Sequence, residues 1–188
     1  MAPPRIVTLA QEAARRAGRR PRISVDAGAH MFSATAFWEC LAPRDVLISN
    51  GLASMGFALP AALAAALDNP ADGAIAFTGD GGLMMCVAEL ATAAEAAAPC
   101  ITIVFNDGAL SLIDIKQQQR QLPPEGVRWA RPDFAAIAEG FGATGFRAST
   151  EAEYITALDA AFALKGPSLI DVTVDPAGYA AQLQAMRG

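Results

Sequence analysis

Apolar residues along this chain form two kinds of pattern that alternate from one end to the other. Short continuous apolar runs, bounded by glycine, proline or aspartate, predict strands that are buried on both faces. Longer segments in which apolar residues recur every three or four positions predict helices. The expected strands span residues 23–25, 46–48, 74–78, 101–105, 144–146 and 168–174. The expected helices span residues 7–17, 31–41, 56–67, 83–97, 133–139 and 151–164.

The order of these elements predicts the fold class. Strands that alternate with helices form parallel sheets, because a parallel connection needs a crossover that a helix supplies. We therefore expect an α/β fold: a doubly wound, Rossmann-like, mostly parallel six-stranded sheet with helices on both faces. Residues 1–22 are interpreted as an N-terminal helix and basic connector, and residues 23–188 as the domain that holds the sheet.

Composition narrows the class of protein. The 188 residues suggest one domain, 53% of them are hydrophobic, and the mean hydropathy is +0.30. No unbroken apolar run reaches the roughly 18 residues of a membrane span, so no membrane partner is expected. The high apolar content has two interpretations. It reflects either buried helices plus a surface for a partner subunit, in a homo- or hetero-oligomer, or simply an alanine-rich sequence.

The formal net charge of −5 is unevenly distributed along the chain. Residues 1–22 contain six arginines and one glutamate, so the rest of the chain is strongly acidic. A basic N-terminal arm could bind nucleic acid or act as a targeting peptide. No aromatic residues interleave with these arginines, however, and the body is acidic. We expect a solvated helix and connector, and no nucleic-acid partner.

The chain has three cysteines, Cys40, Cys86 and Cys100, and no pair has metal-ligand or redox spacing. Each lies in an apolar context, which favours buried thiols in a reducing compartment. The N-terminal sequence does not have the pattern of a secretory signal peptide. The expected location is therefore the cytoplasm.

Polar groups follow two expected strands at their carboxyl ends. Residues 74–78 lead into Gly79-Asp80-Gly81-Gly82, and residues 101–105 lead into Asn106-Asp107-Gly108. Open α/β sheets bind their ligands at this edge. A carboxylate, an amide oxygen and a backbone carbonyl beside a helix N-terminus suit a hard divalent cation that carries a diphosphate. A single carboxylate with neutral oxygens is well matched, because several carboxylates would repel the diphosphate.

Three blocks of the sequence, taken in order, resemble the thiamine diphosphate-dependent enzymes. The blocks are residues 26–30, 49–60 and 80–106. More narrowly, the chain resembles the C-terminal cofactor-binding domain of the acetolactate synthase and 2-oxoacid decarboxylase family, from about residue 26 to about residue 174. The resemblance implies that residues 23–188 form a thiamine diphosphate-binding domain, and that the cofactors are thiamine diphosphate and Mg²⁺.

The resemblance also assigns roles to individual residues. It implies that Mg²⁺ is bound by the Asp80 carboxylate, the Asn106 side-chain oxygen and the Gly108 backbone carbonyl, with two diphosphate oxygens and a water. Taken alone, Asp80 could equally be a helix N-cap and Asn106 a turn residue. The implied cofactor-binding residues are Gly28, Ala29, His30, Ala53, Ser54, Met55, Gly79, Asp80, Gly81, Gly82, Asn106, Gly108, Ala109 and Leu110. No acid–base role is assigned to His30, the only histidine.

Met55 is the residue to which the resemblance gives a catalytic role. In the family, a large apolar side chain at this position wedges between the two rings of the cofactor and bends it. The Met55 N–H and the Ala53 carbonyl would bind the aminopyrimidine edge. Many relatives have glycine where Ala53 stands, but a backbone carbonyl does the binding, so alanine is tolerable. The alternative for Met55 is a core-filling side chain.

The resemblance implies an enzyme that needs more than this chain. Family members use a glutamate from a separate pyrimidine-binding domain, and nothing in this sequence corresponds to that domain. We therefore expect a partner domain or subunit that supplies the glutamate, and a chain that is inactive alone. The expected activity is that of an acetolactate synthase-like lyase or transferase, a decarboxylase or carboligase acting on a small 2-oxo acid.

The sequence departs from the family pattern at one position, and two alternative functions stay open. Biosynthetic acetolactate synthases carry a tryptophan near the position of Ile115, and it is absent here; Ser111 and Leu112 are candidates for pocket lining. The chain could instead be the small subunit of a split two-subunit decarboxylase of the sulfopyruvate or phosphonopyruvate type. A non-catalytic Rossmann-like binding module is the other alternative, although no G-x-G-x-x-G follows a strand.

Overall fold

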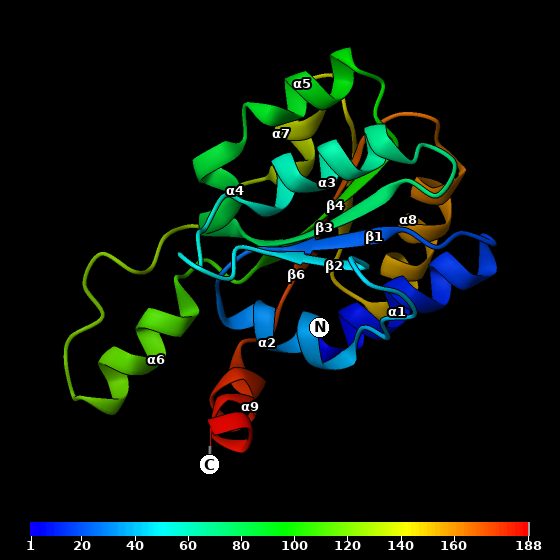
Figure 1. The fold of residues 1–188 in the computed structure, drawn as a ribbon. Coiled ribbons are helices and arrows are strands. Elements are labelled where there is room, and N and C mark those ends of the chain that lie inside the picture. The colour runs from blue at the N-terminus through cyan, green and yellow to red at the C-terminus, as the bar shows by residue number, and fades with distance from the viewer. Residues whose placement is uncertain (188) are drawn as a thin grey trace.

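The structure, a computed structural model, describes residues 1–187 and contains one six-stranded sheet (Figure 1). The strand order is β2-β1-β3-β4-β6-β5, and every neighbouring pair is parallel. This confirms the expected α/β fold, and each expected strand is present to within two residues at either end. The strands are β1 (Arg22–Val25), β2 (Val46–Ile48), β3 (Ala74–Gly79), β4 (Cys100–Asn106), β5 (Thr144–Ala148) and β6 (Ser168–Thr173).

Helices cover both faces of the sheet, as Figure 1 shows. One face carries α1 (Pro3–Arg16), α2 (Ala29–Phe37) and α8 (Glu151–Ala163). The other face carries α3 (Ala58–Asp68), α4 (Asp80–Cys86), α5 (Glu89–Glu95) and α7 (Phe134–Gly140). Two further helices, α6 (Ser111–Gln119) and α9 (Ala177–Arg187), lie beyond the carboxyl ends of the strands and contact each other.

The two faces of the sheet differ in side-chain size. Toward α1, α2 and α8, the central strands present large residues such as Ile75, Phe77 and Phe105. Toward α3 they present Ala74 and Ala76, which pack against the alanines of that helix. Small side chains on both partners let a helix lie close to the sheet. The alanine-rich composition is therefore used in packing α3, whose N-terminus is held at the ligand-binding edge.

The N-terminal helix is part of the main hydrophobic core. Ile6 and Val7 of α1 are fully buried, and the Tyr154 hydroxyl donates a hydrogen bond to the Ile6 carbonyl at 3.2 Å. Four of the six arginines in residues 1–22 pair with acids of the body. The pairs are Arg5–Glu151, Arg15–Glu39, Arg16–Asp159 and Arg22–Asp68. These contacts account for a basic segment on an otherwise acidic chain.

The single helix expected over residues 83–97 is wrong. The structure divides this segment into α4 and α5. At the division, the Leu90 and Ala91 N–H groups donate to the carbonyls of Val87 and Ala88, three residues back, which is a tighter turn than an α-helix makes. The break lets α4 begin at the ligand-binding edge while α5 packs on α3.

Other expectations also need correction. The expected buried state of the cysteines is wrong for Cys40, which is exposed, while Cys86 is half-buried and Cys100 buried. The sequence pattern did not predict α9, although Asp175 and Pro176 are a helix start signal. The Asp175 side chain accepts a hydrogen bond from the Ala177 N–H at 3.0 Å. Within the described part of the chain, no helix has both the length and the apolar character that crossing a bilayer demands.

Candidate functional site

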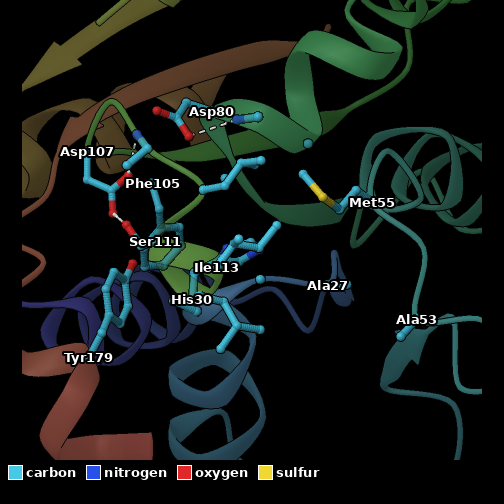
Figure 2. Close-up of a pocket in the computed structure, with 18 residues that line it drawn as sticks. Ala27, His30, Ala53, Met55, Asp80, Phe105, Asp107, Ser111, Ile113 and Tyr179 are labelled. Carbon is cyan, nitrogen blue, oxygen red and sulfur yellow. Dashed lines mark hydrogen bonds between the residues drawn. The ribbon is translucent and has the colours of Figure 1, made fainter. Parts of the chain in front are cut away.

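The site lies at the carboxyl edge of the sheet, at the point where the strand order reverses. β2 lies on one side of β1, and the chain then returns to place β3 on the other side. Open α/β sheets bind ligands in the crevice at such a switch point. A cavity of about 180 Å³ opens here (Figure 2). Its walls come from the segments after β1, β3 and β4, the loop before α3, the start of α6 and one residue of α9.

Asp26, the first residue after β1, joins the elements around the cavity. It is fully buried, and its Oδ1 accepts hydrogen bonds from the N–H groups of Phe57 and Ala58, both at 2.7 Å. Its Oδ2 accepts from the Thr78 hydroxyl at 2.5 Å. One carboxylate therefore connects the end of β1, the start of α3 and β3. This connection fixes the loop before α3 relative to the strand ends.

Asp80 is the first residue of α4 and is only 2% exposed. Its two carboxylate oxygens accept hydrogen bonds from the N–H groups of Gly81 at 2.7 Å and Gly108 at 2.8 Å. Burial, followed by the negative charge of Asp107, raises the pKa of Asp80 to about 6, although the surrounding N–H groups act in the opposite direction. A nearby cation would favour the charged form of this carboxylate.

Asn106 ends β4 and is 3% exposed. Its Nδ2 donates to Asp171 Oδ1 at 2.9 Å and to the Pro132 carbonyl at 3.0 Å. Its Oδ1 is buried and has no hydrogen-bond partner among the described residues. Most buried polar atoms are hydrogen-bonded, so an unpaired amide oxygen at a ligand-binding edge points to a coordinating role.

The residues that follow Asn106 shape the loop between β4 and α6. Gly108 has a φ of +76°, a left-handed conformation that favours glycine, and its carbonyl accepts from the Trp129 N–H at 2.9 Å. A carbonyl has two lone pairs, so one remains for a cation. Asp107 lines the cavity and accepts from the Ser111 hydroxyl at 2.5 Å, which holds the start of α6.

No group of three or more His, Cys, Asp or Glu side chains that could hold a metal exists in residues 1–187. A cation at this edge would therefore need neutral oxygens in addition to the Asp80 carboxylate. The Asn106 amide and the Gly108 carbonyl are such oxygens. The donor set fits Mg²⁺, which prefers oxygen ligands and binds through one or two carboxylates together with phosphate oxygens.

His30 lies at the start of α2 and lines the same cavity. It is 5% exposed, and its ring stacks on Phe105 with 5.3 Å between centroids. Burial lowers the pKa of His30 to about 4, although the Asp26 carboxylate and backbone act in the opposite direction. The imidazole is therefore neutral at pH 7, and its Nε2 has no hydrogen-bond partner among the described residues. The expected contact with phosphate stays a prediction.

Met55 comes from the loop before α3, and its side chain points into the cavity in Figure 2. A Cβ placed on Gly81 would lie 3.3 Å from Met55 Cε, so the two residues are in close contact. Ala53 has a φ of +50°, which explains why glycine suits this position. Ser54 does not line the cavity; its carbonyl accepts from the Ala27 N–H at 3.3 Å.

Gly82 allows α4 to lie against the end of β1. A Cβ at this position would come within 2.4 Å of Asp26 Oδ2 and 2.8 Å of Thr78 Oγ1. At Gly81, a Cβ would come within 2.7 Å of Leu110 Cδ2. At Gly82 the close atoms belong to two buried side chains that are hydrogen-bonded to each other, whereas at Gly81 the close atom is the end of a flexible leucine side chain. Gly82 is therefore needed for the close approach of α4 to the end of β1, and the expected contact of both glycines with the cofactor stays a prediction.

The structure brings most of the expected site residues together. Every expected cofactor-binding residue lines the cavity except Ser54, Asn106 and Gly108. The pocket-lining candidates Ser111 and Leu112 also line it. Sequence reasoning missed five residues that line the cavity: Ala27, Phe105, Asp107, Ile113 and Tyr179. Tyr179 comes from α9, a helix that the sequence pattern did not predict. The other missed residues lie in or beside segments that the sequence analysis had identified, but no motif marks them individually.

A buried carboxylate and an unpaired amide oxygen at the switch point of a parallel sheet define a ligand-binding α/β domain. Residues 26–172 match the family described as thiamine pyrophosphate enzyme, C-terminal TPP binding domain. The chain belongs to this family. Thiamine pyrophosphate, also called thiamine diphosphate, and Mg²⁺ are the standard cofactors of the family.

Individual relatives agree with this assignment. The chain is 38% identical over 157 residues to the acetolactate synthase isozyme 1 large subunit of Escherichia coli (strain K12), covering 81% of this chain and 28% of that protein. It is 32% identical over 153 residues to acetolactate synthase of Bacillus subtilis (strain 168), covering 81% and 27%. The chain therefore spans between a quarter and a third of the length of these relatives.

A solved structure supports the fold. The chain superposes with a TM-score of 0.84 on the thiamine diphosphate-dependent 4-hydroxybenzoylformate decarboxylase of Rhodococcus jostii RHA1. The two share 23% sequence identity, and the match covers 93% of this chain and 33% of the decarboxylase chain. This likeness concerns the fold alone.

Proposed function

We propose that this domain binds thiamine diphosphate through an Mg²⁺ ion held by Asp80, Asn106 and the carbonyl of Gly108. The observation that carries the proposal is the buried, unpaired Oδ1 of Asn106, close in sequence to the Gly108 N–H that binds the Asp80 carboxylate. A cation would coordinate the amide oxygen and favour the charged carboxylate, whose pKa is raised. A single cation would thus coordinate the Asn106 oxygen and stabilise the charged form of Asp80.

The other cavity residues have roles in holding the organic part of the cofactor. Met55 is proposed as the apolar wedge, since its side chain enters the cavity and contacts the position of Gly81. The Ala53 carbonyl and the Met55 N–H are proposed to bind the aminopyrimidine edge. Gly28, Ala29 and His30 would line the diphosphate side. The bound cofactor supplies an electron sink for cleaving the bond next to a 2-oxo group, and the protein supplies binding and orientation.

The proposed activity is that of a 2-oxo acid decarboxylase or carboligase of the acetolactate synthase type. Relatives named acetolactate synthase support it, although this chain matches only about a quarter of their length. Catalysis would require a pyrimidine-binding domain, covalently joined or on another subunit, that supplies a glutamate. Oligomeric assembly and a cytoplasmic location remain predictions of the sequence.

The binding proposal is tested by calorimetric titration of thiamine diphosphate into the chain, with Mg²⁺ and then with EDTA. Binding is expected only with Mg²⁺, and Asp80→Asn should abolish it because the variant removes the only carboxylate among the proposed metal ligands. The matched control is Asp107→Asn, which changes a second carboxylate in the same cavity. We expect this control to retain Mg²⁺-dependent binding. Equal loss in both variants, or binding that persists in EDTA, would contradict the proposed ligand set.

Partner dependence is tested separately. The purified chain, saturated with Mg²⁺ and thiamine diphosphate, should release no CO2 from pyruvate or other small 2-oxo acids, because the glutamate is expected from another domain. Release of CO2 by this chain alone, above the rate of an Asp80→Asn control, would show that the partner is not required.

A further inference from the structure

The side-chain amide of Asn106 has two ends with opposite chemistry, and only one of them can bind a cation. The carbonyl oxygen has lone pairs, whereas the NH2 group has two donor hydrogens. A rotation of 180° about the last side-chain bond exchanges the two ends at almost no steric cost. The proposed metal site therefore depends on a feature that fixes the orientation of this amide.

The surroundings of Asn106 provide two acceptors on one side. Nδ2 donates to Asp171 Oδ1 at 2.9 Å and to the Pro132 carbonyl at 3.0 Å. In the reversed orientation, the amide oxygen would face two acceptors and both hydrogen bonds would be lost. Since both donor hydrogens are used, Oδ1 is left on the opposite side, where it has no hydrogen-bond partner among the described residues.

Asp171 is itself held in place. It lies on β6, where it pairs with Val104 of β4, two residues before Asn106, and its second oxygen accepts from the Phe134 N–H at 3.1 Å. A carboxylate is the only side chain of this size that accepts at both ends. Asp171 can therefore accept from the start of α7 and from the amide of Asn106 at the same time.

We propose that Asp171 is a positioning residue that fixes the Asn106 amide with its oxygen toward the metal. Asp171 lies 65 residues further along the chain and does not line the cavity. Its role in binding rests on the proposed function, but its role in orienting the amide does not. It acts as outer partners of metal ligands do, by determining which atom of the ligand faces the ion.

The informative variant is Asp171→Asn, which keeps the size of the side chain but leaves only one acceptor. If its oxygen receives the Phe134 N–H, its NH2 group faces the NH2 group of Asn106. Two donors then oppose each other, and this conflict is relieved when the Asn106 amide turns over. That rotation would direct an NH2 group toward the metal. The matched control is Asp133→Asn, which changes the exposed N-cap of α7 beside Phe134, a side chain that accepts from Ala136 and Arg147 and gives no hydrogen bond to Asn106.

Two measurements test the proposal. The first is the solvent exchange of the Asn106 side-chain NH2 group, followed by NMR in the metal-free chain. Slow exchange is expected in the wild type and in Asp133→Asn, and fast exchange in Asp171→Asn. The second is the dissociation constant for Mg²⁺ in the presence of thiamine diphosphate. This constant should increase about tenfold in Asp171→Asn, as is typical when an outer partner of a metal ligand is changed, and stay unchanged in the control.

The outcomes separate this proposal from the proposed function. Fast exchange of the Asn106 NH2 group in the wild type would overturn it, even if Asp171→Asn fails to fold. Unchanged exchange in a folded Asp171→Asn would also overturn it, and so would altered exchange with unchanged Mg²⁺ affinity. If the wild type binds no Mg²⁺ and thiamine diphosphate, the proposed function fails, but the exchange measurement still tests the orienting role of Asp171.

Discussion

Two residues at the carboxyl edge of the sheet, Asp80 and Asn106, have polar groups that the rest of the protein does not fully stabilise. The Asp80 carboxyl has a pKa raised to about 6 by burial and by Asp107, and the Asn106 amide oxygen is buried without a partner. Two buried hydroxyls elsewhere in the sheet, those of Thr102 and Ser168, also have no hydrogen-bond partner among the described residues, but neither belongs to a residue that lines the cavity. A carboxyl with a raised pKa at the end of one strand, together with an unpaired amide oxygen at the end of the next, is typical of a functional site. The same residues were singled out from the sequence.

The backbone of Ala53 is in the strained left-handed region, with a φ of +50°. The variant Ala53→Gly should stabilise the chain by roughly 0.5–1 kcal/mol, because the left-handed conformation costs an alanine more than the added freedom of glycine costs the folded state. The control Ala160→Gly, at an exposed position in α8, should destabilise it by about 0.5–1 kcal/mol. Urea unfolding of both variants measures the difference. A destabilised Ala53→Gly would contradict the interpretation.

At the scale of elements, the site depends on how closely helices approach strand ends. α4 can begin beside Asp26 because Gly82 has no side chain. The sequence singled out Gly82 as a cofactor-binding residue, but it did not predict the close approach of α4 to Asp26. It did not predict the break between α4 and α5, because an apolar pattern continues through the break and only the tertiary contacts of α5 with α3 decide where the helix turns.

Substitution of Gly82 tests the contact between α4 and β1. Gly82→Ala should destabilise the chain by at least about 2 kcal/mol, since its Cβ would lie 2.4 Å from a buried carboxylate oxygen. Gly140→Ala is the control, because a Cβ on this α7 glycine meets nothing within 4 Å, and it should be neutral or slightly stabilising. Thermal unfolding compares the two. A tolerated Gly82→Ala would mean that α4 does not need to lie this close to Asp26.

The capping box of α8 gives a pH-dependent prediction. The Glu153 carboxylate accepts from the N–H groups of Ser149 and Thr150, and these bonds hold its pKa below the ordinary value. A lowered pKa in the folded state means that the contribution is present at neutral pH and is lost as pH falls through the acidic range. Wild type should therefore unfold at a higher temperature than Glu153→Gln at pH 7. The difference should shrink as the pH is lowered through the acidic range, and a difference independent of pH would contradict this.

For the whole molecule, the strands and the parallel sheet were predictable because each strand is a separate apolar run between turn residues, whereas the order of the strands in the sheet was not predicted. The division at residue 22 was a weaker inference from charge, and it remains a proposal. The structure packs α1 into the same core as β1 and α8, so the basic segment is attached through its apolar side. The spacing of apolar residues in α1 indicates a buried face, whereas the cluster of arginines indicates only its exposed side.

The role of α1 in overall stability can be measured. Ile6→Ala should destabilise the whole domain by about 2–5 kcal/mol, because Ile6 is fully buried in the main core. Arg16→Ala, which removes an exposed ion pair with Asp159, should cost less than about 1 kcal/mol. Denaturant unfolding followed by circular dichroism gives both values. If Ile6→Ala left the unfolding midpoint unchanged, α1 would be an independent arm.

The contribution of α9 to the cavity was the part of the site least accessible to sequence reasoning. Tyr179 is 2% exposed and lines the cavity, but its position depends on the packing of α9 against α2 and α6. No motif near Tyr179 identifies such a contact. Residues from distant elements are brought to one edge by the whole fold, so local pattern cannot reveal them.

The most direct test of the central claim is a crystal structure of the chain with thiamine diphosphate and Mn²⁺ in place of Mg²⁺. The account predicts an anomalous peak about 2 Å from both an Asp80 carboxylate oxygen and Asn106 Oδ1, with the diphosphate bound to the same ion. A peak that contacts Asp107 but neither of these atoms, or a diphosphate bound away from this edge, would contradict it.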